Sequence, residues 1–313
     1  MAHDFSCLAT GIGSLPLTDP DVAVALTRRY LPEAPVWPQL PKRGFQEQMG
    51  AQYSEALPGI VRDEARQRFF FDTTRDLTAE LERFYERYLE KDYEYFGLSE
   101  DFAAGFHAFL RALEKSPPAH ARFLKGHVTG PLTAGISFKD EQGRDIIHHE
   151  QLFDAVVKNL AMKAAWQIVR LGRFGKPVIV FLDEPAMETL GSAFSPAAPE
   201  LVAEKLDEII DAIHERGGIA GRPVSPPCLD ANGFELAAPV LAADVEADHV
   251  EDDVLKGGVA VMAVRAPAAG GKVNLHIPAP GRRVADLHDR APEIGAALDA
   301  AETRMKDAHR LAV

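Results

Sequence analysis

The sequence predicts an α/β protein, and the arrangement that it favours is a parallel barrel. Short apolar runs that end in Gly, Pro or acidic residues alternate with longer segments of helical periodicity, which is typical of parallel α/β folds. The chain has 313 residues, a common length for one barrel-sized domain. We therefore expect a single domain over residues 1–313.

The first third contains one strand, one hairpin and three helices in this interpretation. A strand is expected at 8–12, closed by a glycine-rich turn, and a helix from Asp19-Pro20 to Arg29. Apolar residues on both sides of the polar turn 63–66 predict a hairpin over 58–73. Two further helices are expected, at 77–96 and 99–114.

The middle third shows the strand and helix alternation most clearly. Strands are expected at 123–129, 178–182 and 218–221, and helices at 149–172 and 199–216. The run at 178–182 is apolar without interruption, as in a parallel strand covered on both faces. The first of the two helices places these residues on one buried face: Phe153, Val156, Val157, Leu160, Ala164, Ile168 and Leu171.

The composition changes beyond residue 221. Of the 25 aromatic residues only Phe234 lies in this last part of the chain. Weak strands can be drawn at 244–250, 258–264 and 273–277, and one helical face near the C-terminus consists of Ile294, Leu298, Ala301, Met305 and Ala308. We expect a barrel that is incomplete or altered in its C-terminal third, with 222–313 as a divergent tail.

Charge and composition exclude several classes of partner. The net charge is −13, and Lys and Arg are scattered singly, which argues against nucleic-acid binding. No apolar run approaches the roughly 18 residues of a membrane span, and the polar start Met1-Ala2-His3-Asp4 does not resemble a secretory signal. Cys7 and Cys228 lie far apart, so a disulfide framework is not expected. These features predict a cytoplasmic protein; they do not specify an oligomeric state.

Four segments rich in Gly, Pro and polar residues, 10–16, 37–43, 125–133 and 181–185, end or follow the expected strands. Pockets in parallel α/β folds form at this edge of the sheet, because main-chain amides and short polar side chains converge there. We therefore expect one concavity lined by Gly13, Ser14, His127, Thr129 and Asp183.

Each candidate also has a structural interpretation. The main-chain amides of Gly13 and the hydroxyl of Ser14 suit a carboxylate or phosphate, yet the same residues form an ordinary tight turn without the third glycine of a dinucleotide site. Asp183 and Glu184 point in opposite directions along a strand, and such an acid caps a loop about as often as it binds substrate. His127 is either a base or a structural histidine.

Two further polar groups are interpreted as surface features. His148-His149 lies at a helix start and is a weak metal candidate, and Glu251-Asp252-Asp253 is a charged surface run. Neither a Cys-x-x-Cys nor an HExxH spacing occurs in the sequence.

Taken together, four motifs resemble the catalytic barrel of cobalamin-independent methionine synthase and its short single-barrel relatives in the uroporphyrinogen decarboxylase/methionine synthase superfamily. The resemblance covers about 1–221. Its motifs are Ile12-Gly13-Ser14-Leu15-Pro16, Trp37-Pro38-Gln39-Leu40-Pro41, Lys125-Gly126 with Thr129-Gly130-Pro131 and Thr133, and Asp183-Glu184-Pro185-Ala186. It implies a TIM-type (β/α)8 barrel and a methyltransferase of methionine biosynthesis, in which a zinc thiolate of homocysteine takes a methyl group from methyltetrahydropteroyltriglutamate, a folate.

The resemblance also implies roles for individual residues. Ile12, Gly13 and Ser14 would hold the carboxylate of an amino-acid-like thiol, and Asp183 would bind its amino group. Thr129 and Glu184 would add substrate contacts. Asp183 and His127 are the catalytic candidates.

The chain departs from the family where the zinc and the folate are bound. The His-x-Cys pair expected after 218–221 is absent, which leaves Cys228 as a weak metal candidate and no confident ligand set. Ile136 stands where the full-length synthases carry an aromatic residue that stacks on the pterin. Thr189 replaces a family acid, with Glu188 one residue early. We expect the purified protein to carry less than about one-tenth of an equivalent of zinc.

Three hypotheses follow. The first is a thiol methyltransferase with a degraded or rebuilt zinc site. The second is a non-catalytic relative that binds a small amino acid, and the third is a metal-free decarboxylase-like lyase of the same superfamily. A shifted reading frame between about 222 and 290 would explain the loss of both the aromatic residues and the zinc pair; resequencing the gene tests it.

Overall fold

The structure is a computed structural model, and it describes residues 8–63, 65–190, 195–221, 261–265 and 274–276. Within these residues the protein is mixed α/β and includes a parallel sheet. The described strands form three sheets, and none of the three closes into a barrel. The chain folds into two compact units: unit 1 comprises Met1–Leu40, Gly105–Lys125 and Gly221–Val313, and unit 2 comprises Pro41–Ala104 and Gly126–Ala220.

Unit 1 contains an antiparallel sheet. Strand β1 (Leu8–Gly11) confirms the expected strand at 8–12 and pairs with β7 (Val261–Arg265), which in turn pairs with β8 (Asn274–His276). Both later strands overlap weak strands expected from the sequence; the third of these, at 244–250, lies outside the described residues. A parallel neighbour was expected for β1, and the antiparallel pairing corrects this, because an apolar run indicates burial but not the direction of the partner strand.

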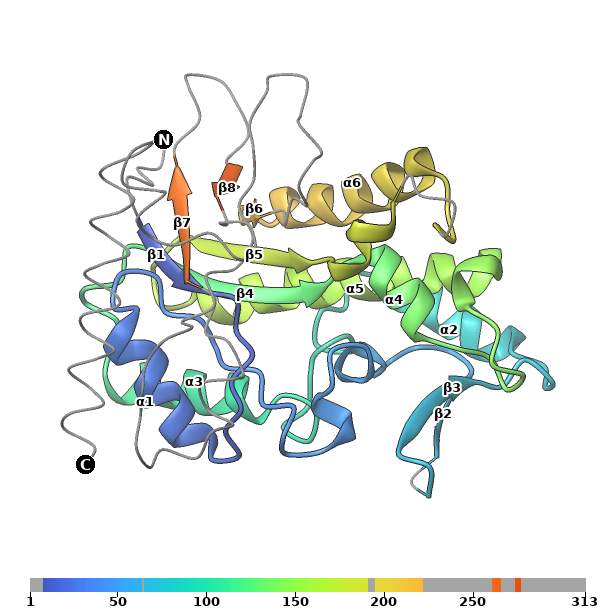
Figure 1. The fold of residues 1–313 in the computed structure, drawn as a ribbon, viewed down its shortest axis with the longest axis horizontal. Coiled ribbons are helices and arrows are strands. Elements are labelled where there is room, and N and C mark those ends of the chain that lie inside the picture. The colour runs from blue at the N-terminus through green and yellow to red at the C-terminus, as the bar shows by residue number, and fades with distance from the viewer. Residues whose placement is uncertain (1–7, 64, 191–194, 222–260, 266–273, 277–313) are drawn as a thin grey trace. The chain divides into compact units, whose positions relative to one another are not determined.

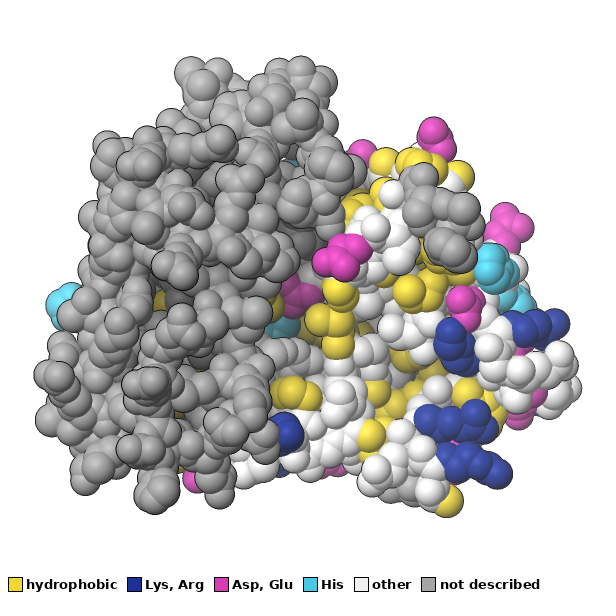
Figure 2. Space-filling view, in the orientation of Figure 1, with side chains coloured by type: hydrophobic (Ala, Val, Ile, Leu, Met, Phe, Trp, Pro, Cys, Tyr) yellow, Lys and Arg dark blue, Asp and Glu magenta, His cyan; other side chains and the backbone are white. Residues whose placement is uncertain are grey.

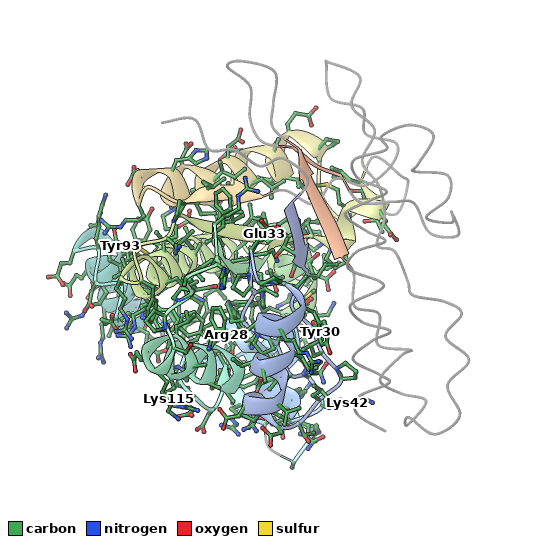
Figure 3. The ribbon with its side chains drawn as sticks, turned by 90° about the vertical axis from the view of Figure 1, so that its left-hand side faces the viewer. Arg28, Tyr30, Glu33, Lys42, Tyr93 and Lys115 are labelled. Atoms are coloured by element: carbon green, nitrogen blue, oxygen red, sulfur yellow. The ribbon has the colours of Figure 1, made fainter. Side chains whose placement is uncertain are left out.

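The helices of unit 1 are α1 (Pro20–Tyr30) and α3 (Ala104–Lys115). As expected, α1 begins after Asp19, whose carboxylate accepts hydrogen bonds from the main-chain amides of Asp21 and Val22. Arg28 lies between the two helices (Figure 3) and donates to the carbonyls of Ala112 and Ser116 at 2.9 and 2.7 Å. Arg28 thus satisfies carbonyls at the C-terminal end of α3.

Unit 2 is built around a parallel sheet of order β4-β5-β6 (Figure 1). The strands are β4 (Leu124–Thr129, in this unit from Gly126), β5 (Val178–Asp183) and β6 (Ile219–Gly221), in agreement with the expected strands. All residues of β4 and β5 are buried, as the apolar run at 178–182 predicted. The connections are α4 (Pro131–Ser137), α5 (Glu150–Gly172) and α6 (Pro199–Glu215).

The hairpin expected at 58–73 is confirmed in unit 2. Strands β2 (Ile60–Asp63) and β3 (Arg68–Phe71) pair antiparallel, with Ile60 opposite Phe71. Figure 2 shows Lys and Arg side chains gathered over this hairpin, which carries the exposed Arg62, Arg66 and Arg68.

Helix α2 (Thr78–Leu89) is shorter than the expected segment 77–96. After it the chain turns through Lys91, whose φ is +54°, and buries Phe96 against Phe84 at a ring-centroid distance of 5.3 Å. The aromatic residues beyond 89 therefore belong to a turn that packs on the helix rather than to the helix itself. Short 3₁₀ turns complete the unit: η1 (Phe45–Glu47), η2 (Ala51–Tyr53), η3 (Ile146–His148) and η4 (Pro185–Thr189).

Helix α5 is buried over more than its apolar face. Asn159, Lys163 and Gln167, spaced four residues apart, are all fully buried and form a polar stripe along the helix. Asn159 donates to the carbonyl of Tyr53 at 2.7 Å, and Lys163 to that of Phe96 at 3.0 Å. Burial lowers the pKa of Lys163 to about 8. None of the described helices has both the length and the apolar character that crossing a membrane requires.

Candidate functional site

The carboxyl ends of β4 and β5 bring two of the predicted site residues together. The amide of Gly130 donates to the carbonyl of Asp183 at 2.7 Å. In a parallel ladder this bond places Asp183 beside Thr129, and side chains of neighbouring residues lie on the same face of the sheet. Both residues are more than nine-tenths buried. Thr129 and Asp183, which belong to motifs distant in the sequence, are therefore neighbours at this edge of the sheet. That they line one concavity stays a prediction.

His127 lies on the same face of β4 as Thr129, because side chains alternate along a strand. The opposite face is turned to α5: a Cβ added to Gly126 would overlap the amide oxygen of Gln167. Gln167 also holds the main chain of His127, accepting from its N–H at 3.2 Å and donating to its carbonyl at 2.9 Å. The His127 side chain is itself 1% exposed. Whether His127 serves as a base or as a structural residue stays a prediction.

Tyr53 joins these residues from the 3₁₀ turn η2, and sequence reasoning missed it. Its hydroxyl donates to the carbonyl of His127 at 3.0 Å, and its side chain is buried. Burial and then the charge of Asp183 raise the pKa of Tyr53 well above its ordinary value. Tyr53 follows no expected strand and belongs to no periodic segment, so no signal in the sequence marks it.

The hydroxyl of Thr129 is also directed to the segment that contains η2. It donates to the carbonyl of Met49 at 3.0 Å. The segment from Met49 to Tyr53 is therefore joined to the end of β4 through two hydroxyl groups, those of Thr129 and Tyr53.

Glu184 caps α4. Its carboxylate accepts from the amides of Leu132 and Thr133 at 2.9 and 2.6 Å and from the hydroxyl of Thr133, which also accepts from the amide of Ala186. Burial raises the pKa of Glu184 to about 7, although these hydrogen bonds lower it. A Cβ on Gly130 would overlap the same carboxylate. Of the two interpretations offered for the acids at the end of β5, the loop-capping one thus describes Glu184.

The turn after β1 belongs to unit 1 and contains the other predicted substrate residues. Gly13 has a φ of +140°, which disfavours any residue with a side chain. The Ser14 hydroxyl donates to the side-chain oxygen of Gln39 at 2.5 Å, and the carbonyls of Ile12 and Gly13 accept from Lys125 Nζ and the Gln39 amide. Among the described residues, no partner accepts from the N–H groups of Gly13 and Ser14.

Some of the predicted metal candidates lie within the described residues, and others lie outside them. His149 caps α5, since its Nδ1 accepts from the amide of Leu152 at 3.3 Å, and the neighbouring His148 is exposed. Within the described residues no group of three or more His, Cys, Asp or Glu side chains is arranged to hold a metal ion. Three further predictions lie outside the described residues: Cys228 as a weak metal candidate, the charged run 251–253 and the helical face expected near the C-terminus.

Each unit by itself offers polar groups to a small ligand. Unit 1 offers main-chain amides after β1, and unit 2 offers carboxylate and hydroxyl oxygens at the ends of β4 and β5. Comparison of the chain with family models, with curated proteins and with solved structures found no match.

Proposed function

We propose that the protein binds a small amino acid with a thiol side chain and transfers a methyl group to that thiol, as the cobalamin-independent methionine synthases it resembles do. One observation carries the proposal: Thr129 and Asp183, from two family-like motifs, are neighbours at the carboxyl ends of adjacent parallel strands. The proposal includes a TIM-type (β/α)8 barrel altered in its C-terminal third. The unit β4-α4-α5-β5-α6-β6 supports it, since such a barrel repeats strand and helix in this order.

The proposed roles follow the chemistry of the residues. In unit 2, Asp183 binds an ammonium group, and in unit 1 the N–H groups of Gly13 and Ser14 bind a carboxylate. His127 takes the proton of the thiol, because the thiolate is the nucleophile. The sulfur then forms a bond to the methyl carbon while the bond between that carbon and the donor breaks.

Zinc and folate are the family's partners in this reaction. Zinc, when bound, lowers the pKa of the thiol, but the described residues do not offer a ligand set for it. Ile136 in α4 replaces the pterin-stacking aromatic residue, so the methyl donor is left open to folates and to other methyl carriers.

The test is an assay of methionine formation from L-homocysteine and methyltetrahydrofolate, together with calorimetric titration of L-homocysteine alone. Turnover with saturable binding supports the proposal, and absence of both contradicts it. Elemental analysis after dialysis measures zinc in the same preparation, with an expected content below about one-tenth of an equivalent. Near-stoichiometric zinc that is lost in Cys228→Ser would instead show a rebuilt site.

A second candidate function is binding of the amino acid without turnover. It is favoured by the absence of the His-x-Cys pair from the segment that ends at Cys228. Saturable binding of L-homocysteine without methionine formation from any methyl donor would identify it.

A further inference from the structure

We infer that the β2-β3 hairpin of unit 2 is a docking surface for an acidic, partly apolar peptide segment of another protein. The residues that carry this inference are Val61, Asp63, Arg66, Arg68 and Phe70, and we call them the hairpin patch. Figure 2 shows Lys and Arg side chains gathered over this hairpin. The inference concerns a surface and does not depend on the proposed methyl transfer.

The pairing of β2 with β3 divides the hairpin side chains between two faces. On the inner face Phe71 is fully buried, and the Phe69 ring lies 5.1 Å from the ring of Phe45. Side chains alternate along a strand, so the residues one position away on each strand belong to the outer face. The cross-strand pairs of the outer face are Val61 with Phe70 and Asp63 with Arg68.

Two arginines of the hairpin patch already bind one carboxylate. Nη1 of Arg66 donates to Oδ2 of Asp63 at 3.0 Å, and Nε of Arg68 donates to the same oxygen at 3.4 Å. The hydrogen bond from the Arg66 side chain is the main cause that lowers the pKa of Asp63 below its ordinary value. The internal pair thus shows that these guanidinium groups stabilise an ionised carboxylate.

Most donors of the two guanidinium groups remain for a second carboxylate. A guanidinium group has five N–H donors, and within the described residues neither Nη2 of Arg66 nor either Nη of Arg68 donates to an acceptor. The Arg68 guanidinium lies over the Phe70 ring at 4.9 Å from its centroid, and stacking directs its N–H groups sideways. Both arginines are exposed, so these donors can reach a partner.

The charge of the hairpin is opposite in sign to that of the whole chain. Residues 62–68 contain three arginines and two acids, whereas the chain has a net charge of −13. Charged side chains on a hairpin also prevent aggregation, but acids would serve that purpose equally, and this chain contains more acids than bases. Arginine is the residue that binds carboxylates with two parallel hydrogen bonds. Charge complementarity therefore favours an acidic partner.

The apolar pair of the outer face selects a peptide among the acidic partners. Val61 and Phe70 are partly exposed beside the arginines. A small anion would leave this pair in water, whereas a peptide with neighbouring acidic and apolar side chains would contact both parts of the hairpin patch. A membrane is a poorer partner, because the described turn residues Ala65, Arg66 and Gln67 include no large apolar side chain to enter the bilayer.

Fluorescence anisotropy with the full-length protein tests the inference. The probe is the fluorescein-labelled, amidated peptide Gly-Asp-Asp-Phe-Asp-Gly, and the comparison peptide has Asn in place of each Asp. We expect saturable binding of the Asp peptide and binding of the Asn peptide that is weaker by about tenfold or more. Raising the salt concentration from about 50 to about 300 mM should weaken binding of the Asp peptide severalfold, because salt screens exposed charges.

Three variants of the hairpin patch identify the binding groups. Arg66→Gln and Arg68→Gln should each weaken binding of the Asp peptide by about fivefold, and the double variant by about twentyfold, since exposed charge pairs each contribute modestly. Phe70→Ala should weaken it by a similar factor, because it removes both the apolar contact and the ring under Arg68. Circular dichroism and thermal unfolding establish that each variant is folded.

The matched control is Arg87→Gln in α2. The Arg87 side chain is 43% exposed and that of Arg68 is 44% exposed. Nη1 of Arg87 likewise donates to carboxylates, those of Glu90 and Asp92, at 3.3 and 3.2 Å. We expect Arg87→Gln to bind the Asp peptide as the wild type does. An equal loss in this control would overturn the inference, because any exposed arginine would then serve.

The remaining outcomes also decide the inference. Absence of saturable binding of the Asp peptide would overturn it, and so would equal binding of the Asp and Asn peptides. Tighter binding of phosphatidylserine vesicles or of a single-stranded oligonucleotide, lost in the Arg66 and Arg68 variants, would assign the hairpin to another class of partner. Dimers in sedimentation velocity that Arg68→Gln abolishes would identify a second copy of this chain instead. Homocysteine takes no part in these measurements, so their failure leaves the proposed function unaffected.

Discussion

The turn after β1 and the paired ends of β4 and β5 contain similar polar residues but offer opposite hydrogen-bonding groups. After β1, the Ser14 proton and the carbonyls of Ile12 and Gly13 are used within the protein, whereas no acceptor for the N–H groups of Gly13 and Ser14 occurs in the part of the chain that the structure describes. At the ends of β4 and β5, the protons of Thr129 and Tyr53 are used, and acceptors remain.

This difference shows that a hydroxyl group does not indicate what a site binds until its proton has been assigned. Ser14 and Thr129 would both be described as polar side chains near a strand end. A donor-rich turn is complementary to a carboxylate, whereas an acceptor-only set is complementary to an ammonium group.

The largest effect is expected for Asp183→Asn. The variant removes the negative charge of Asp183 while keeping the side-chain volume. We expect the affinity for L-homocysteine to fall by about 300-fold, since losing one partner of a buried charge pair costs about 2–5 kcal/mol. Titration calorimetry measures it. Asp154→Asn in α5, where the carboxylate accepts from the Tyr85 hydroxyl, is the matched control. A loss of affinity of similar size in that variant would show that the effect is not specific to Asp183.

The next effect is a dependence of the free energy of unfolding on pH, which the buried carboxyl group of Glu184 should cause. Burial raises the pKa of Glu184 from 4.5 to about 7. A carboxyl group with a raised pKa binds its proton more tightly in the folded state, so its contribution favours folding below pH 4.5 and is lost as the pH rises to about 7. We expect the free energy of unfolding of the wild type, relative to Glu184→Gln, to fall by about 3 kcal/mol across that interval.

Urea unfolding at a series of pH values measures this difference. Glu141→Gln is the control with the opposite sign, because hydrogen bonds from the Thr73 and Glu141 main-chain amides lower the pKa of Glu141. Stability of the wild type relative to that control variant should rise with pH. If the free energy of unfolding of the wild type relative to Glu184→Gln also rose with pH, the amides of α4 would hold Glu184 ionised despite its burial.

A smaller effect is expected for Gly13→Ala in the donor-rich turn. A φ of +140° is strained for alanine, and we expect a loss of about 1–2 kcal/mol in the free energy of unfolding. γ-Mercaptobutyrate is homocysteine without its amino group. The affinity for this compound should also fall in the variant if the amides of this turn bind the carboxylate. Gly172→Ala at the end of α5, where a Cβ would meet open space, is the control and should not destabilise the protein.

The smallest effect is expected for Ser14→Ala. Because its proton is already given to Gln39, the hydroxyl has none to give to a substrate carboxylate. We expect the affinity for γ-mercaptobutyrate to change by less than about threefold, and stability to fall by about 1 kcal/mol from the lost hydrogen bond. A loss of tenfold or more in affinity would show that the Ser14 proton turns to the ligand, and the comparison of the two regions would then fail.

The strands and most helices were predictable because their signals are local. An apolar run that stops at Gly130-Pro131 or at Asp183 marks a strand without reference to the rest of the chain, and Asp19 marks a helix start. The neighbourhood of Thr129 and Asp183 was predictable for the same reason, since parallel strands share their carboxyl edge.

The features that the sequence did not predict depend on contacts between residues that are far apart in the chain. Helix α4 was not expected, because its first amides are satisfied by Glu184, far along the chain. Tyr53 enters the site through a single hydrogen bond to β4. Periodicity also missed the polar stripe of α5, since it counts apolar positions and treats Lys163 as a surface residue.

The contact between Gln167 and His127 has a consequence for association. In the described sheet β4 is an outer strand, and the main-chain groups of an outer strand can pair with a strand of another molecule. The carboxamide of Gln167 takes both the N–H and the carbonyl of His127, as a neighbouring peptide group would. A helix side chain thus occupies the position where an intruding strand would bind, so the main-chain groups of His127 are not available to a strand of another molecule.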